Sequence, residues 1–197
     1  MRVSWAVLAL LAGCTSVEPA YFTLAAVPGT LQPGTLQPGA ARPGTPQFGA
    51  PALVELRRPG IAGYLDRPEI VRGGGYQLKV ASNERWGEPF GDLFGRVLAE
   101  DLNRRLPGTT VFTAAGSISA TADATVEVDV QRFDADGTGT VVLAVQVAVS
   151  RVRRGPATTR AIRLQRPAGA TTVELVMAMS ALVGDMADQV AGMLRAQ

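Results

Sequence analysis

The chain has 197 residues, of which 19 are basic and 17 acidic, so its charge of +2 is nearly balanced and indicates no particular partner. It contains no histidine and a single cysteine, which removes the usual general base, the commonest metal ligand and any internal disulfide. No basic stripe interleaved with aromatic residues and no zinc-ligand spacing is present, so we expect no nucleic-acid partner, no catalytic site, no metal site and no cofactor.

The first fourteen residues have the pattern of a lipoprotein signal peptide. Arg2 is followed by a short apolar run, Val3 to Leu11, which is too short to span a bilayer. Leu11-Ala12-Gly13-Cys14 then places two small residues before the only cysteine. We expect residues 1–13 to be removed and Cys14 to carry acyl chains such as palmitate. The alternative is an ordinary secretory signal with an incidental cysteine.

Residues 14–20 are expected to form a short tether, about 20 Å long at full stretch up to Tyr21. Tyr21-Phe22-Thr23-Leu24 is rich in β-formers and predicts a short strand. A five-residue Pro-Gly repeat dominates residues 28–50, and it disfavours both helix and sheet. We interpret it as a disordered, solvated insertion; a spacer or a partner-binding arm is the alternative.

Several elements are expected in the next third of the chain. Residues 52–57 have strand character, and Tyr76 to Val80 alternate as in a half-buried strand. The triplet Gly73-Gly74-Gly75 lacks the Lys-Ser/Thr pair of a phosphate loop, so we expect a flexible loop there. Apolar residues three and four apart predict a helix from Pro89 to Arg105, and a short strand follows at residues 110–113.

The last third predicts a β-meander and a long helix. Strict alternation at residues 126–131 and 141–149, around the turn at residues 134–139, is typical of a hairpin. A third strand is expected near residues 158–165. From Thr172 onwards an apolar stripe predicts a helix that packs on the sheet, formed by Leu175, Met179, Leu182, Met186, Val190 and Met193. Together these elements predict a compact α/β single domain at residues 21–197, with a mixed, largely antiparallel sheet and two main helices packed on it.

Three segments in this order resemble one family. They are Tyr64-Leu65-Asp66-Arg67-Pro68-Glu69-Ile70-Val71, then Arg85-Trp86-Gly87-Glu88-Pro89-Phe90, and the meander that begins at Val126. Together with the lipoprotein signal and residues 21–24, they resemble the PqiC-type auxiliary lipoproteins of ABC-type transport systems. The resemblance covers nearly the whole mature chain except residues 28–50.

The resemblance implies an outer-membrane lipoprotein that faces the periplasm and belongs to an intermembrane phospholipid transport system. Its implied partner is a periplasmic protein with mammalian-cell-entry (MCE) domains, and the family also suggests a ring of identical subunits. Thr15 after the lipidated cysteine agrees with the outer-membrane sorting that the resemblance implies, since aspartate at that position often signals retention in the inner membrane. We therefore expect a non-catalytic subunit that docks the MCE component at the outer membrane and supports envelope integrity.

The matched segments supply candidate residues for a partner interface. Asp66 and Arg67 place a charge pair before a proline, Tyr64 is a rigid aromatic, and Glu69 and Trp86 flank them. For Tyr64 and Asp66 the alternative is structural, with the ring packed on the sheet and the carboxylate capping a turn. For Trp86 the favoured interpretation is a hydrophobic staple of the following helix, and an exposed contact residue is the alternative.

Three other functions compete with this hypothesis. A periplasmic lipid-binding carrier would enclose an acyl chain between the methionine-rich helix and the sheet. A general outer-membrane assembly lipoprotein would share the anchor but not the transport partner. A hydrolase would use carboxylates such as Glu88 and Asp92, although their position at a helix start already explains them.

Overall fold

A computed structural model gives the fold, and it describes residues 18–28, 49–74, 76–152 and 155–196. The predicted signal peptide, the lipidation site Cys14 and nearly all of the Pro-Gly insertion therefore lie outside the described residues. No helix in the described ranges is long and apolar enough to cross a membrane.

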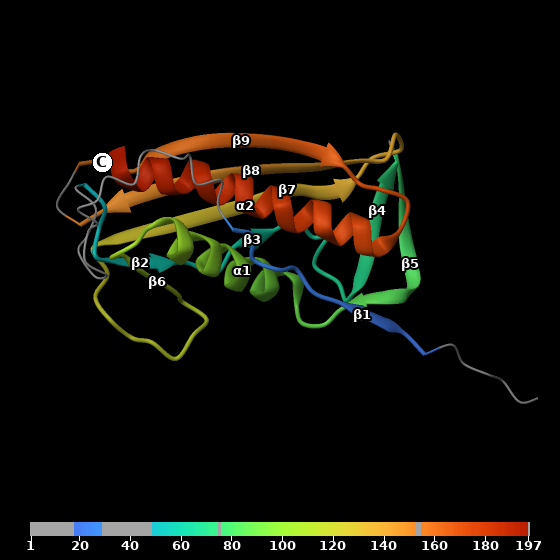
Figure 1. The fold of residues 1–197 in the computed structure, drawn as a ribbon, viewed down its shortest axis with the longest axis horizontal. Helices are drawn as coiled ribbons and strands as arrows, with labels where there is room; N and C mark the ends of the chain where they lie inside the picture. The colour runs from blue at the N-terminus through green and yellow to red at the C-terminus, as the bar shows by residue number, and fades with distance from the viewer. Residues whose placement is uncertain (1–17, 29–48, 75, 153–154, 197) are drawn as a thin grey trace, which may run out of the picture.

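The described residues form nine strands and two helices in two layers (Figure 1). In chain order these are β1 (Ala20–Phe22), β2 (Leu53–Leu56), β3 (Gly60–Ile61), β4 (Glu69–Gly74), β5 (Gln77–Trp86), α1 (Phe90–Arg105), β6 (Thr110–Thr113), β7 (Ala124–Ala135), β8 (Thr140–Arg151), β9 (Thr158–Pro167) and α2 (Thr172–Ala196). The predicted α/β class and its two main helices are confirmed.

The larger sheet contains six strands in the order β6-β2-β7-β8-β9, with β3 also paired to β7. β7, β8 and β9 form the predicted antiparallel meander, whereas β2 lies between β6 and β7 and runs parallel to both. Along β7 and β8 the alternating valines are buried and the residues between them are more exposed. One face of this sheet is therefore apolar, and both helices cover it (Figure 1).

Both helices bury the apolar stripes that their sequences predict. On α1, Phe90, Leu93 and Phe94 are almost completely buried, and Phe94 meets Phe133 of β7 edge-on at 6.0 Å between ring centroids. All six predicted stripe residues of α2 lie in the core, and three of them are the methionines Met179, Met186 and Met193. The methionines thus fill the space between helix and sheet, and that space is where the carrier hypothesis would have placed a lipid.

A second, three-stranded sheet in the order β1-β5-β4 lies at one end of the molecule (Figure 1). β1 runs parallel to β5, with Ala20 opposite Glu84 and Phe22 opposite Trp86, and β4 runs antiparallel to β5. The expectation of one sheet is thus replaced by two.

The expectation of a flexible loop at the glycine triplet is wrong for its first two residues, because Gly73 and Gly74 end strand β4. A Cβ on Gly73 would lie 3.0 Å from the Asp134 carboxylate of β7. Glycine lets this strand approach β7 closely, which sequence alternation alone does not reveal.

Candidate docking site

Tyr64 is fixed to the main sheet through a buried carboxylate. Its hydroxyl donates to Asp134 Oδ2 at 2.7 Å, and Arg132 Nε donates to Asp134 Oδ1 at 3.0 Å. Burial, reinforced by the Asp134 carboxylate, raises the pKa of the Tyr64 phenol well above its ordinary value. Of the two interpretations of Tyr64, the structure shows the packed and hydrogen-bonded one.

The turn after Tyr64 presents charged side chains to solvent. The amide of Leu65 donates to the Ala62 carbonyl at 2.8 Å, that of Arg67 donates to the Leu65 carbonyl at 2.9 Å, and the Leu65 side chain is buried. Asp66 and Arg67 are exposed. Neither side chain makes a hydrogen bond or an ion pair with any residue that the structure describes, so both are free to meet a partner.

Trp86 stabilises this turn from inside the molecule. Its amide donates to the Pro68 carbonyl at 2.7 Å, and its ring packs against Phe90 with centroids 5.0 Å apart. Only 6% of Trp86 is exposed, which agrees with the favoured interpretation that it packs onto α1 and leaves little of its ring for a partner. The half-buried Glu69 lies beside it, opposite Arg85 in the strand register.

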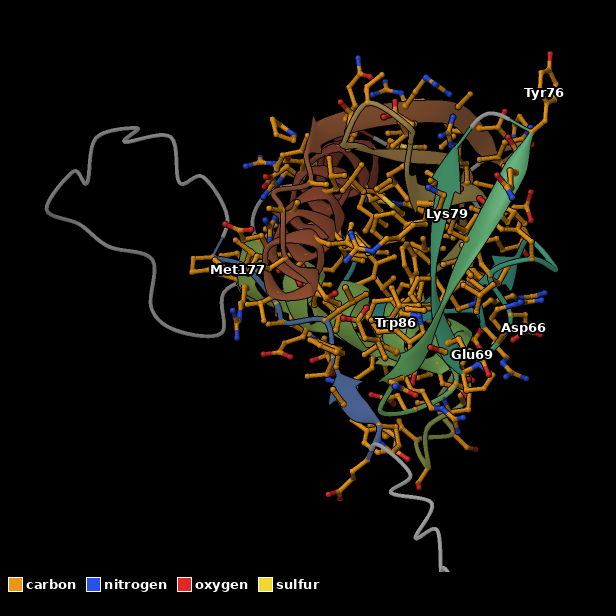
Figure 2. All side chains as sticks on the ribbon, turned by 90° about the vertical axis from the view of Figure 1, so that its right-hand side faces the viewer. Asp66, Glu69, Tyr76, Lys79, Trp86 and Met177 are labelled. Carbon is orange, nitrogen blue, oxygen red and sulfur yellow. The ribbon has the colours of Figure 1, made fainter. Side chains whose placement is uncertain are left out.

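The β4–β5 hairpin adds an exposed apolar surface that the sequence interpretation missed. Leu78 and Val80 are 48% and 41% exposed, and Tyr76 at the tip is fully exposed. Figure 2 shows Tyr76 pointing away from the rest of the molecule, with Lys79 on the strand below it. Three large apolar side chains within five residues form a patch of the kind that marks interaction sites.

The backbone of the same hairpin is open along one side. β4 pairs with one edge of β5, but on the other edge β1 reaches only Glu84 to Trp86. Among the described residues nothing pairs with that edge over residues 77–83, which we call, together with Tyr76, the hairpin edge. Unpaired backbone groups of such an edge strand can add a strand from a partner.

The other long edge strand of the molecule is protected differently. β9 pairs only with β8 and carries Arg160, Arg163 and Arg166 on a largely exposed strand. Charged side chains of this kind hinder edge-to-edge pairing. Compared with β9, the edge of β5 thus combines an open backbone with exposed apolar side chains.

A polar relay fixes the hairpin to the N-terminus of α2. Arg72 Nη2 donates to Thr172 Oγ1 at 2.7 Å, and Thr172 Oγ1 donates to Glu84 Oε1 at 2.5 Å. The relay joins both strands of the hairpin to the helix, so it holds the position of the hairpin relative to α2.

The hairpin tip and the N-terminal strand lie at opposite ends of β5. β1 pairs with the last three residues of β5, and the tip precedes its first residue. Seven residues of β5, Gln77 to Asn83, separate the tip from the part that β1 covers, which corresponds to about 23 Å.

The described residues contain no group of three or more potential metal ligands. The carboxylates considered for hydrolysis are both engaged in ion pairs on the surface. Glu88 accepts from Arg96 at 2.5 Å, and Asp92 pairs with Arg58 at 3.0 Å. The candidate site thus consists of the open strand of the hairpin beside the charged turn.

Comparison with known proteins places this fold in a family. The model of the ABC-type transport auxiliary lipoprotein component matches residues 35–191. An uncharacterised protein of known crystal structure has a TM-score of 0.70 at 18% identity, covering 90% of this chain and 99% of its own. Protein XCC0632 from Xanthomonas campestris, of the family DUF330, has a TM-score of 0.65 at 16% identity, covering 89% and 95%. A search of curated proteins found no match.

Proposed function

Because the chain belongs to the family of ABC-type transport auxiliary lipoproteins, we propose that it is the non-catalytic subunit that docks a periplasmic MCE-domain protein at the outer membrane. Membership in the family makes it an envelope lipoprotein of the transport-auxiliary kind. The docking role, the outer-membrane location and phospholipid as the transported molecule are the parts that we propose.

The observation that carries the docking role is the hairpin edge. It offers backbone groups for main-chain pairing and alternate side chains for specificity, which is how strand addition recognises a partner. Asp66 and Arg67 add charges on the turn that leads into β4, beside the half-buried Glu69. In this proposal, the hairpin edge supplies affinity and the charged turn supplies orientation.

The position of the anchor supports the same arrangement. A lipid on Cys14 would hold β1 within about 20 Å of the membrane surface. The hairpin tip, at the far end of β5, would then lie farther into the periplasm, where a protein that bridges the two membranes can reach it.

Site-specific photo-cross-linking in native membranes tests this proposal. The full-length lipidated protein would carry a photoreactive residue at Leu78, at Asp66 or, as a matched control, at the exposed Ile118 in the loop after β6. We expect an MCE-domain protein to be captured from positions 78 and 66 and not from 118. Self-cross-links, counted separately, would report ring formation.

Two outcomes would contradict the proposal. Capture of only porins or assembly factors from all three positions would favour the general outer-membrane assembly lipoprotein. Equal capture of the MCE-domain protein from 78 and 118 would preserve the partner but remove the hairpin edge as its docking site.

A further inference from the structure

A second exposed apolar surface lies between the N-terminal arm, residues 21–27, and the first half of α2. It is a groove of about 570 Å³, which we call the arm groove. Its lining is almost entirely apolar and includes Tyr21, Phe22, Val27, Val173, Val176 and Met177. Figure 2 places Met177 on the opposite side of the molecule from the tip residue Tyr76.

The side chains around the arm groove are unusually exposed for their type. Tyr21 is 65% exposed and Met177 is 66% exposed. Val173, which is also exposed, precedes Met177 by four residues, so the two project from the same face of α2. This is the face opposite the buried stripe, where a helix of a soluble domain normally carries polar residues.

The backbone of the last residues of the arm, in contrast, is already hydrogen-bonded. Ala25 donates its amide to Ser180 Oγ at 3.1 Å, and Val27 donates its amide to Asp101 Oδ1 at 3.0 Å. The carbonyls of Ala26 and Val27 accept from Arg104 and Arg105. With these backbone groups occupied, residues 25–27 offer apolar contact and little scope for strand pairing.

The sequence places the arm groove next to the membrane anchor. Tyr21 follows Cys14 by only seven residues, and the described chain begins at Glu18. The arm therefore leaves the domain beside the groove, at the end of the chain that leads to the lipid. An amphipathic tyrosine with neighbouring aliphatic side chains suits the boundary between head groups and acyl chains.

We propose that the arm groove rests on the lipid surface, with Tyr21, Val173 and Met177 inserted among the acyl chains. The proposal rests on the lipid anchor of the proposed function, and it adds a second membrane contact that fixes the domain's orientation. Arg96 and Arg104, which border the arm, are paired with Glu88 and Glu100. The contact is consequently apolar rather than ionic, and we expect it to be insensitive to salt.

Depth-dependent fluorescence quenching tests this contact. Acylated Cys14 does not react with thiol reagents, so Met177→Cys provides a unique labelling site in the full-length lipidated protein, and Ile118→Cys provides an equally exposed control. Each variant is labelled with an environment-sensitive dye and reconstituted into phosphatidylethanolamine–phosphatidylglycerol vesicles whose acyl chains carry a quencher. We expect a blue shift and strong quenching at 177, unchanged by salt, and only background quenching at 118.

The alternative outcomes separate this inference from the proposed function. Protein that floats with the vesicles but shows equal background quenching at both positions overturns the groove contact and leaves the anchor intact. Protein that does not float overturns the anchor and the groove contact with it. A label at 177 that is already shielded before vesicles are added means that the chain itself or a second copy fills the groove, which also overturns the inference.

Discussion

The hairpin edge and the arm groove both expose large apolar side chains, but they differ in what their backbones offer. Along the hairpin edge, residues 77–83 have no strand partner on one side among the described residues. In the arm groove, the backbone of residues 25–27 is bonded to side chains of α1 and α2. Apolar exposure alone therefore does not identify a partner. An open backbone suits another polypeptide, whereas a satisfied backbone with apolar walls suits lipid.

The largest expected effect on stability comes from removing the Asp101 carboxylate, which holds the arm against α1. Asp101 is fully buried, and its Oδ1 accepts both from the Val27 amide and from Arg105 Nη1 at 3.0 Å. Asp101→Ala leaves the buried Arg105 with one fewer anionic partner, so we expect a loss of about 3 kcal/mol in the free energy of unfolding. Urea denaturation measures the loss, and hydrogen exchange should show residues 24–27 released while the hairpin stays protected.

Asp92→Asn is the matched control, because the Arg58–Asp92 pair lies on the surface. We expect it to cost less than about 1 kcal/mol. An equal cost for both variants would mean that the Asp101 network does not hold the arm.

The next effect concerns the base of the charged turn. Tyr64→Phe removes the hydrogen bond to the Asp134 carboxylate, and we expect a loss of about 1.5–3 kcal/mol at neutral pH. Folding raises the pKa of Tyr64 above its ordinary value of 10.0, so its contribution is complete below that pH and is lost as the pH rises above it. The stability difference between wild type and variant should therefore stay constant up to about pH 9 and shrink between about pH 10 and about pH 12. Denaturation curves that keep a constant difference across this range would exclude the bond.

A smaller effect is expected where the hairpin meets α2. Thr172→Val keeps the shape of the side chain but removes the bonds with Arg72 and Glu84, which should cost about 1–2 kcal/mol. Hydrogen exchange should accelerate in β4 and β5 and remain unchanged in residues 24–27. Thr159→Val, on the exposed part of β9, serves as the control and should be neutral within about 0.5 kcal/mol. Acceleration in both regions would show that the two surfaces are not independent.

The smallest effects on stability give the sharpest test of the comparison itself. Leu78→Glu and Met177→Glu change exposed side chains and should each alter the free energy of unfolding by less than about 0.5 kcal/mol. We expect Leu78→Glu to reduce capture of the protein partner while leaving the vesicle contact intact, and Met177→Glu to do the reverse. Capture of the protein partner and contact with vesicles are measured for both variants. A variant that lost both would contradict the assignment of the hairpin edge to a protein and of the arm groove to lipid.

The sequence predicted where helices and strands form more reliably than it predicted which strands pair with each other. Alternation in β7 and β8 and the stripes of α1 and α2 are local signals, and all four elements form where they were expected. The parallel pairing of β1 with β5 joins residues more than sixty positions apart, which no local period reports. β4 was missed because Gly73 and Gly74 favour a loop when their approach to Asp134 is unknown.

The candidate site was predicted in part for the same reason. Asp66 and Arg67 are exposed, whereas Trp86 is buried. An aromatic ring just before a helix can point into the core or into solvent, and only the packing of the folded domain decides between the two. For Leu78 and Val80 the alternation predicts a half-buried strand. Alternation shows that the two faces of a strand differ, but it does not show whether a second layer covers either face. Asp101 fell within the apolar stripe of α1, where the sequence gives no sign that its carboxylate binds the arm.

The side-by-side pairing of β1 and β5 also lets the domain transmit force between its proposed lipid anchor and the hairpin edge. A pull on a lipid at Cys14 acts along β1, and the three residue pairs from Ala20–Glu84 to Phe22–Trp86 lie across that direction and share the load. The strand that receives this tension is the one that carries the hairpin edge. Traction between membrane and partner would thus pass through β5, and pulling the protein by its N-terminus in a force spectrometer would show whether β1 yields before the meander.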